Sequence, residues 1–488
     1  MNIIFIVIDT LRYDYIGANG NEWIETPNLD RLAAQSWNFT NSFTSSYPTI
    51  PHRTDVITGA YGNPFHMWRP LPYDVPTLPE ALARLGYGTQ LIHDTPHLVN
   101  GGHNFDFPFH AWTVVRGGEV DRSTLTDRLH VPEHWAKDPL FDNQPDAPAL
   151  PEFPNREYNV TDTYLQTNHR RTRYEDWNCA QLFLAARDFV RENARREKFF
   201  LWLDCFDPHE PWDVPPEFVL KYEQTPGYDG RVDPRVFALK ESSGLNEDAV
   251  RRIRNYYAAK VSWVDHWLGH LLDGLEETGL NRNTAILLTS DHGTNDGTVN
   301  GFGKKVPPRE AEAHTPFMVS VPGMGSGTCD SIVQPQDGFE TVLRIAGGTS
   351  PGSLDSHDLL AVAEQKKNGL REIAIAGLPP TAQRKVMFTA FDGKWCLEVS
   401  ARPEECRLIR VGQTEDVSSD HPGVVADLRQ KALKEYERRG ADPAIMDWLQ
   451  TEGTKPFPSR YTPHKFYPVP SGFQHYFKRL YHGGFAGE

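Results

Sequence analysis

Three separate segments of the chain share one hydrophobic pattern, in which a short run of apolar residues is followed at once by polar side chains. The runs cover residues 2–8, 199–203 and 285–288. Uninterrupted β-branched and aromatic runs of this length are typical of strands buried on both faces of a parallel sheet. Acidic or imidazole side chains follow each run, namely Asp9, Asp204, Asp207, His209, Asp291 and His292. Because open α/β sheets bind ligands outside the carboxyl ends of their strands, we expect these segments to meet at one site.

Between these runs the apolar residues recur with the period of a helix. Residues 257–275 place apolar side chains at steps of three or four, and residues 182–190 carry a shorter stripe of the same kind. Both patterns predict amphipathic helices that cover the sheet. The alternation of buried strands and helices therefore predicts an α/β fold with a parallel sheet.

The chain changes character after about residue 345. Short antiparallel strands and one helix packed on them are predicted there, at residues 386–391, 395–399, 407–411 and 424–438. We therefore divide the chain into three parts: a main α/β domain (1–345), a smaller α+β subdomain (346–455) and a C-terminal arm rich in aromatic residues (456–488). So many rings predict that the arm packs on a neighbouring subunit or at the rim of the site. We expect a homo-oligomer.

Residues 131–154 contain six prolines and no helical period, which predicts a long loop. This loop belongs to a larger stretch, residues 100–175, that we expect to form substrate loops or a lid.

Composition narrows the choice of function. The 488 residues include 50 Lys and Arg against 65 Asp and Glu, a formal net charge of −15, which disfavours a nucleic-acid binder. No apolar run approaches the length of about 20 residues that a membrane-spanning helix needs. We find no secretory signal, and the five cysteines are odd in number and widely spaced, so we expect a cytoplasmic protein with reduced thiols.

Six short motifs, met in order along almost the whole chain, resemble the sulfatase branch of the alkaline phosphatase superfamily. The most specific is a nucleophile motif, a residue that is Cys or Ser in sulfatases followed by x-Pro-x-Arg and then Thr-Gly, which here reads Thr49-Ile50-Pro51-His52-Arg53 and Thr58-Gly59. The others surround Asp9, Asn28, His209, Asp291 and Lys304. The resemblance implies a large, mostly parallel mixed sheet sandwiched by helices, with a smaller C-terminal α+β subdomain.

One departure from the family pattern bears directly on the chemistry. Sulfatases of this family oxidise the motif Cys or Ser to formylglycine, whose hydrate attacks sulfur and then expels sulfate by collapsing to the aldehyde. Threonine is not a substrate for that oxidation, so this route is closed at Thr49. A threonine hydroxyl can still attack phosphorus when a metal ion lowers its pKa, and the phosphodiesterase and phosphonate-hydrolase relatives include threonine nucleophiles.

The resemblance also implies a ligand set for one divalent cation, consisting of Asp9, Asp291, His292 and Thr49. Carboxylate oxygens with one imidazole suit a hard or borderline cation. Many sulfatases carry a second carboxylate where this chain has Thr10, a difference that favours Mn²⁺ or Zn²⁺ slightly over Ca²⁺. An alternative is a second metal site made of Asp207, His209 and His314, since His314-Thr315 resembles a zinc ligand of two-metal phosphoesterases. We favour one metal because Lys304, which replaces the second cation in sulfatases, is present.

The remaining site residues are assigned from the same resemblance. Arg53 would hold Thr49 and offset the charge of the transferred group, while His209 and Lys304 would contact its oxygens and protonate the leaving group. Thr10, His97 and His314 stand at positions that would contact the substrate.

Three functions compete at this point. The leading hypothesis is a metal-dependent hydrolase of phosphate diesters, phosphonate monoesters or related small anionic esters, with Thr49 as nucleophile. The second is a sulfate-ester hydrolase that works without formylglycine, and the third is an inactive relative that only binds an anion or a partner. The presence of the metal ligands together with Arg53, His209 and Lys304 argues against the third.

Overall fold

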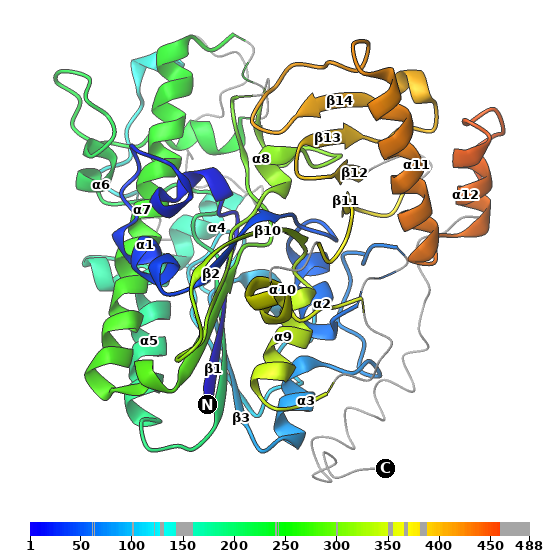
Figure 1. Ribbon diagram of the computed structural model, residues 1–488. Helices are drawn as coiled ribbons and strands as arrows, with labels where there is room; N and C mark the ends of the chain where they lie inside the picture. Colours follow the sequence, from blue (N-terminus) through cyan, green and yellow to red (C-terminus); the bar gives the residue numbers. More distant parts are fainter. Residues whose placement is uncertain are drawn as a thin grey trace.

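The computed structural model describes residues 1–60, 62, 64–99, 102–121, 123–126, 131–142, 160–239, 242, 244–298, 301–349, 355–365, 369–380 and 388–458. An eight-stranded mixed sheet forms its centre, in the order β10-β2-β9-β6-β1-β5-β3-β4 (Figure 1). Every strand runs in the same direction except β9, which pairs antiparallel with β2 and β6. The strands are β1 (Asn2–Ile8), β2 (Trp37–Ser42), β3 (Gly88–His93), β4 (Ala111–Val114), β5 (Phe199–Cys205), β6 (Thr284–Thr289), β9 (Phe317–Ser320) and β10 (Gly327–Val333).

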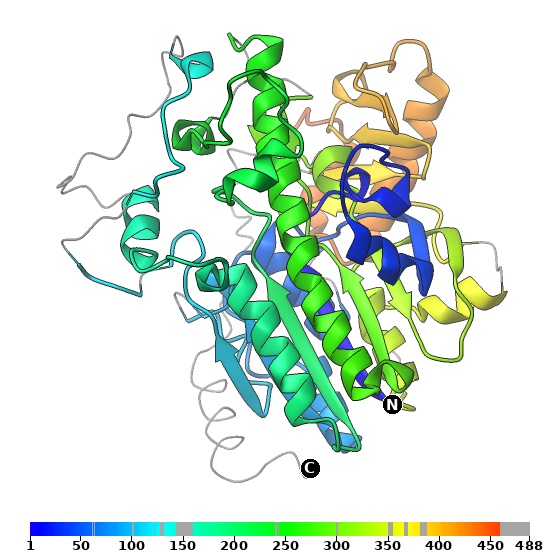
Figure 2. The same ribbon diagram turned by 90° about the vertical axis from the view of Figure 1, so that its left-hand side faces the viewer.

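Strand β1 shows why the sheet needs helices on both faces. Its alternate residues enter two different hydrophobic cores: Ile4, Ile6 and Ile8 pack in one, and Ile3, Phe5 and Val7 in the other. Helices cover each face (Figures 1 and 2). The first face carries α1 (Pro27–Ala34), α5 (Asn178–Glu192) and α7 (Glu247–Thr278), and the second carries α2 (Thr49–Thr58), α3 (Leu78–Arg84), α9 (Asp337–Ile345) and α10 (Leu359–Gln365). The predicted fold class, with its sandwiched sheet, is confirmed.

Helix α7 is longer than the apolar pattern of residues 257–275 indicates. The helix begins at Glu247, ten residues before the pattern, and Asn246 caps its N-terminus by accepting a hydrogen bond from the amide of Ala249. Several buried positions on this helix are charged and paired, as with Arg252, whose Nε donates to Glu223 over 2.8 Å. A buried ion pair is invisible to a count of apolar residues. None of the helices in the described ranges is long and apolar enough to cross a membrane.

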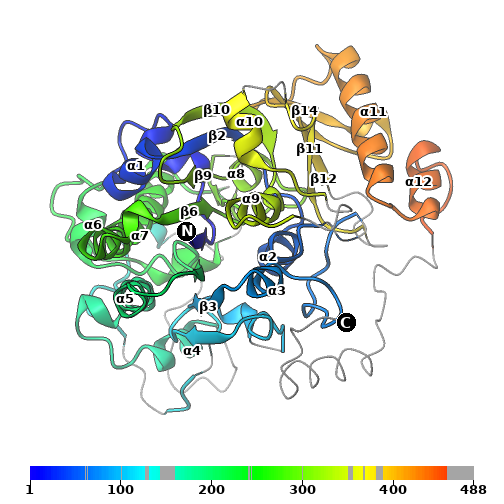
Figure 3. The same cartoon turned by 60° about the horizontal axis from the view of Figure 1, so that its bottom comes forward.

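The C-terminal part contains a four-stranded antiparallel sheet with the order β11-β12-β13-β14. Its elements are β11 (Ala374–Gly377), β12 (Phe388–Phe391), β13 (Trp395–Glu398), β14 (Arg407–Arg410), α11 (Pro422–Arg438) and α12 (Pro443–Gln450). Helix α11 packs on one face of this sheet (Figures 1 and 3). The other face contacts the main domain through Phe43 and Ala313. A small α+β unit was predicted here, and the boundaries at residues 345 and 455 stay predictions.

The edge of this small sheet holds the segment that leads to Thr49. The amide of Gly377 donates to the carbonyl of Ser45, and the amide of Tyr47 donates to the carbonyl of Gly377, both over 2.9 Å. The C-terminal sheet therefore helps to position the start of α2.

Shorter elements complete the described chain. They are α4 (Val160–Thr167), α6 (Pro216–Leu220), α8 (Glu310–Ala313) and the two-residue strands β7 (Asn295–Asp296) and β8 (Phe302–Gly303). Parts of the expected substrate loops (100–175), and the aromatic arm beyond residue 458, lie outside the described residues. Just before that point, Phe457 packs on Trp448 with ring centroids 5.3 Å apart.

Candidate active site

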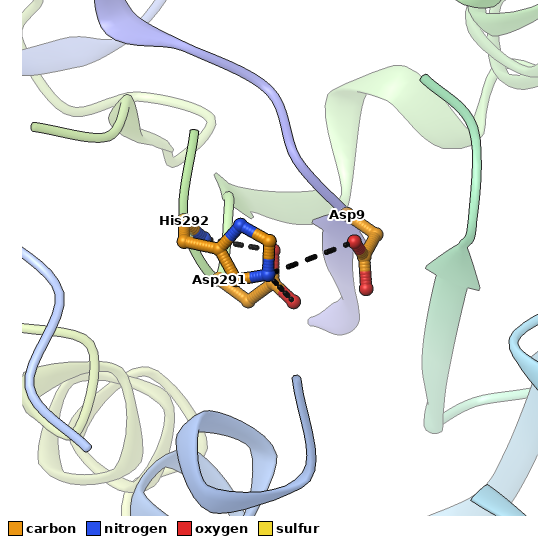
Figure 4. Close-up of side chains that lie close together, drawn as sticks. All are labelled: Asp9, Asp291 and His292. Atoms are coloured by element: carbon orange, nitrogen blue, oxygen red, sulfur yellow. Dashed lines mark hydrogen bonds and ion pairs between the residues drawn. The ribbon is translucent and has the colours of Figure 1, made fainter. Parts of the chain in front are cut away.

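The carboxyl ends of β1 and β6 bring three side chains together. Asp9 follows β1, and Asp291 and His292 follow β6, its neighbour in the sheet. One ligand atom from each lies within 4.8 Å of the others, and this is the one such group of His, Cys, Asp and Glu in the described part of the chain. All three are fully buried and point toward one another (Figure 4). The structure thus brings together the three side chains assigned to a metal ion.

The hydrogen bonds around these side chains leave the right atoms free for a cation. His292 Nδ1 lies 2.7 Å from the carbonyl oxygen of Gly293, which can only accept, so Nδ1 carries the proton and Nε2 keeps its lone pair. His292 Nε2 is buried and has no hydrogen-bond partner. Asp9 Oδ2 is also buried and makes no hydrogen bond, although it lies 3.1 Å from Arg53 Nη2 as an ion pair. Buried orphan atoms are costly unless a ligand satisfies them, and an outer partner that fixes the imidazole tautomer is typical of metal sites. The residues present therefore fit one divalent cation.

The two carboxylates differ in their electrostatic surroundings. Burial and the charge of Asp291 raise the pKa of Asp9 well above its usual value. Burial alone would raise the pKa of Asp291 too, but His292 and Arg53 bring it well below the usual value. Burial lowers the pKa of His292 to about 3, so this ring is neutral at pH 7 and can act as a ligand.

Thr10 holds both carboxylates in place. Its Oγ1 donates to Asp9 Oδ1 over 2.6 Å, and its amide donates to Asp291 Oδ1 over 2.9 Å. Its φ angle of 63° is in the left-handed region, which a β-branched residue adopts at a cost of about 1–3 kcal/mol. Thr10, expected to contact substrate, is thus placed as an anchor of the two acidic side chains.

Thr49 is the first residue of α2 and is fully buried. Its Oγ1 has no hydrogen-bond partner. Six residues later on the helix, Asp55 fixes the preceding segment by accepting bonds from the amide of Ser46 over 2.7 Å and from its hydroxyl over 2.8 Å. The threonine hydroxyl is therefore held on a rigid element without being used by the fold.

Arg53 connects α2 to the cluster. Its Nη1 donates to the carbonyl oxygen of Thr49 over 3.2 Å and to Asp291 Oδ2 over 2.5 Å. Its Nε and Nη2 meet the carboxylate of Asp204 at 3.0 and 2.8 Å. The guanidinium, fully buried, thus contacts three carboxylates, those of Asp9, Asp204 and Asp291. This geometry fixes the position of Thr49 relative to the acidic group.

Asp204 was not singled out for a role by the sequence, although it directly follows an apolar run as Asp9 does. It is fully buried at the end of β5 and also accepts from Thr95 Oγ1 over 2.6 Å and from the indole of Trp202 over 3.1 Å. Its position at a strand end was the one available signal. Its function here is to balance and orient Arg53.

Replacing Asp204 by Asn should destabilise the protein by about 3 kcal/mol, because removing one partner of a buried ion pair leaves the other charge poorly compensated. Urea unfolding of Asp204→Asn against wild type measures this difference. The matched control is Asp273→Asn, which removes an exposed partner of Arg31 and should cost less than about 1 kcal/mol. Equal effects of the two substitutions would show that Arg53 does not depend on Asp204.

His209 and Lys304 form a second polar pair. His209 Nε2 lies 3.0 Å from Lys304 Nζ. His209 Nδ1 faces acceptors only, with the carbonyl oxygen of Glu210 at 2.8 Å and Glu119 Oε2 at 3.2 Å, so Nδ1 carries the proton. Burial and the charge of Lys304 lower the pKa of His209 to about 4. In this arrangement the ammonium group of Lys304 donates to a neutral imidazole.

His97 is close to this pair. Burial lowers the pKa of His97 to about 3, and the charges of His209 and Lys304 act in the same direction. His97 and His209 both contact the ring of Phe206, so His97 lies near the pair, and its expected contact with substrate stays a prediction.

The three residues of the alternative second metal site do not form a ligand group. Asp207 is ion-paired with Lys260 over 2.9 Å. His314 Nε2 lies 2.9 Å from the carbonyl oxygen of Thr40, and its ring stacks on Tyr13 at a centroid distance of 4.0 Å. His314 lines a different cavity of about 150 Å³ with Arg12, Arg309 and Cys396. The geometry therefore supports one metal ion, and neither the second site nor substrate contact by His314 has structural support.

The chain belongs to the sulfatase family, whose sequence model matches residues 1–348. Enzymes of this family hydrolyse anionic esters and use a divalent metal ion. The resemblance found in the motifs is therefore confirmed for the family, which does not test the role of Thr49.

Individual relatives are distant. An arylsulfatase of Clostridium perfringens is 27% identical over 76% of this chain and 80% of its own length. The iduronate 2-sulfatase of mouse is 26% identical over 66% of this chain, and the match covers 60% of that enzyme. The multifunctional alkaline phosphatase superfamily protein PehA of Trinickia caryophylli is 26% identical over 76% of this chain and 78% of its own length. Among solved structures, the phosphonate monoester hydrolase of Agrobacterium radiobacter shares the fold, with a TM-score of 0.66, 18% identity and coverage of 90% and 96% of the two chains.

Proposed function

We propose that the protein hydrolyses phosphate diesters, phosphonate monoesters or related small anionic esters, with the hydroxyl of Thr49 as nucleophile. The observation that carries this proposal is the buried Thr49 Oγ1, which has no hydrogen-bond partner at the nucleophile position of the family motif. A hydroxyl with no structural use, fixed by Arg53 beside a buried acidic cluster, is arranged as a reactive group requires.

Asp9, Asp291 and His292 would hold one divalent cation, with Thr49 completing the set. When bound, such a cation lowers the pKa of a neighbouring hydroxyl and withdraws charge from the ester oxygens. Of the candidate ions, Mn²⁺ and Zn²⁺ suit this set slightly better than Ca²⁺, because an imidazole is present and Thr10 replaces a further carboxylate.

The reaction would proceed in two displacements. In the first, Thr49 Oγ1 gives up its proton to water and bonds to phosphorus, while the bond from phosphorus to the leaving oxygen breaks. Lys304 and His209, which share one hydrogen bond, supply the proton that the leaving oxygen takes up. In the second, a water molecule adds its hydroxyl to phosphorus as the bond from Thr49 to phosphorus breaks, and its remaining proton returns to Thr49 Oγ1. The pair of Lys304 and His209 regains a proton from solvent. Arg53 holds Thr49 in place in both steps.

A second candidate is the hydrolysis of sulfate esters without formylglycine. It is favoured by the names of relatives, since an arylsulfatase and an iduronate 2-sulfatase are among them. It is disfavoured by Thr49, because a threonine sulfate ester could not be cleared by collapse to an aldehyde. The two candidate functions therefore differ in the bond that water must break to release Thr49. This bond is to phosphorus in the first function and to sulfur in the second.

The role of His209 can be tested through the leaving group. His209→Ala should lower kcat/KM for an alkyl aryl phosphodiester with a phenol leaving group by about 10²-fold or more, but much less for a nitrophenol, which needs little protonation. Rates for wild type and variant on a phenyl, chlorophenyl and nitrophenyl series measure the difference. His421→Ala, which removes an exposed histidine of the C-terminal sheet region, is the control and should leave the series unchanged. An equal loss on all three esters would remove His209 from proton transfer.

A further inference from the structure

Four rings in contact lead from the polar pair outward to the surface. The imidazole of His209 stacks on Phe206, with centroids 4.3 Å apart and planes 16° apart. Phe206 meets His97 edge-on at 5.8 Å, and His97 meets Trp68 edge-on at 5.0 Å. These rings come from three parts of the chain: the loop after α2, the end of β3 and the end of β5. Trp68 therefore stands at the outer end of a continuous aromatic path that begins at the proton-transfer pair.

Trp68 is 41% exposed, and among the exposed tryptophans Trp23, Trp68 and Trp112 it is the one that belongs to this ring path. Its ring also meets His103 edge-on, at a centroid distance of 6.1 Å. Two imidazoles thus support the indole from the protein side. The remaining surface of the indole is open to solvent.

The surroundings of Trp68 suit an anionic ester that carries a ring. Arg53 and Lys304 supply positive charge for the anionic end, and the charges of both lower the pKa of His97. The pKa of His97 is lowered to about 3, so this ring is neutral at pH 7 and adds no charge next to Trp68. The ring path therefore joins the polar end, where the anionic group would lie, to the indole of Trp68.

We propose that Trp68 binds the organic part of the substrate, and that this part is a ring with a flat apolar face, either an aryl group or the C–H face of a sugar. This inference rests on the proposed function for the place of the anionic group, but not on whether that group contains phosphorus or sulfur. Exposed indole rings bind such faces well, because stacking combines apolar burial with the quadrupole of the indole.

Binding of product-like anions tests the proposal without turnover. Isothermal titration of the metal-loaded wild type should show phenylphosphonate bound about 3- to 10-fold more tightly than methylphosphonate, a gain typical of one aromatic contact. In Trp68→Ala the two affinities should become nearly equal, and Trp68→Phe should recover part of the difference. Glucose 6-phosphate against ethyl phosphate forms the second arm and separates a sugar from an aryl group. Preference in either arm that depends on Trp68 supports the proposal.

Trp112→Ala is the matched control, because Trp112 is 49% exposed on the edge strand β4 and is not part of the ring path. It should leave all four affinities unchanged. Phenyl sulfate against methyl sulfate completes the set: a Trp68-dependent preference confined to the sulfates would keep the proposal while contradicting the phosphoesterase assignment. The proposal for Trp68 would be overturned if wild type and Trp68→Ala showed the same ratio of affinities in every pair of anions.

Discussion

Thr49→Ala is expected to lower the turnover of an aryl phosphodiester by about 10³-fold or more while the protein folds as wild type does. Removing a nucleophile leaves only the catalysis that comes from electrostatic stabilisation and binding. Because Thr49 Oγ1 makes no hydrogen bond in the structure, its loss leaves no partner unsatisfied, and the fold is affected little. The large effect on rate and the small effect on stability together distinguish a reactive hydroxyl from a structural one.

Thr49→Ser, with its intact mass showing that the serine is not oxidised to formylglycine, serves as the control, since it keeps the hydroxyl and removes only a methyl group. It should retain turnover, and after rapid acid quenching a phenylphosphonate ester should leave its phosphonyl group on the peptide that contains Thr49 in wild type but not in Thr49→Ala. Mass spectrometry of the digested protein detects this adduct. An alanine variant that turns over as fast as wild type would exclude Thr49 as the nucleophile.

Asp291→Ala is expected to lose the bound metal. Changes at residues that only support a metal ligand lower affinity by roughly 10- to 100-fold, and removal of the ligand itself should cost at least as much. The substitution also deprives Arg53 Nη1 and the amide of Thr10 of their acceptor, which loosens the position of both neighbours. Elemental analysis by inductively coupled plasma mass spectrometry, after dialysis of both proteins side by side, measures the metal content and identifies the ion.

Asp265→Asn controls for the removal of any buried carboxylate. Asp265 lies on α7 and accepts from the amides of Asn28 and Leu29 at the start of α1. Both helices cover the same face of the sheet, the one that also carries α5. This variant should lose stability but keep its metal. A full complement of metal in Asp291→Ala would place the ion elsewhere in the molecule.

The strands of the central sheet were predictable to different degrees. The run of residues 2–8 predicts β1 to the residue, and β5 and β6 extend the predicted runs by two residues each. These strands are buried on both faces, so their composition alone reveals them. Strand β2, by contrast, alternates apolar and polar residues such as Asn38 and Thr40 and gave no such signal. Its place in the sheet depends on pairing with β9 and β10, which are almost 300 residues away along the chain.

The metal cluster could be predicted because it follows from strand order. Asp9 and Asp291 stand after strands that pair in register, so a rule about strand ends places them together. The position of His314 could not be derived in this way. The carbonyl oxygen that accepts from its ring lies in β2, and its ring partner Tyr13 lies in the loop after β1. These contacts turn His314 away from the cluster toward another cavity.

Asp204 and Trp68 show the same limit. Nothing in the residues around Asp204 indicates that its partner is Arg53, which lies on a helix that begins 155 positions earlier in the chain. Only the contact between α2 and β5 in the structure reveals the pair. Trp68 lies in a loop without periodicity, where a lone aromatic residue carries no prediction. Such contacts are set by tertiary packing, for which local patterns contain no information.

The most direct test of the proposed function is to measure kcat/KM of the metal-loaded wild type on a matched aryl set: a sulfate, a phosphate monoester, a phosphate diester and a phosphonate monoester with one common leaving group. We expect the diester or the phosphonate ester to be turned over faster than the sulfate by orders of magnitude, because a threonine intermediate at phosphorus can be cleared by water. Thr49→Ala should abolish that preference. A wild-type preference for the aryl sulfate would contradict the phosphoesterase assignment and establish a sulfatase that works without formylglycine.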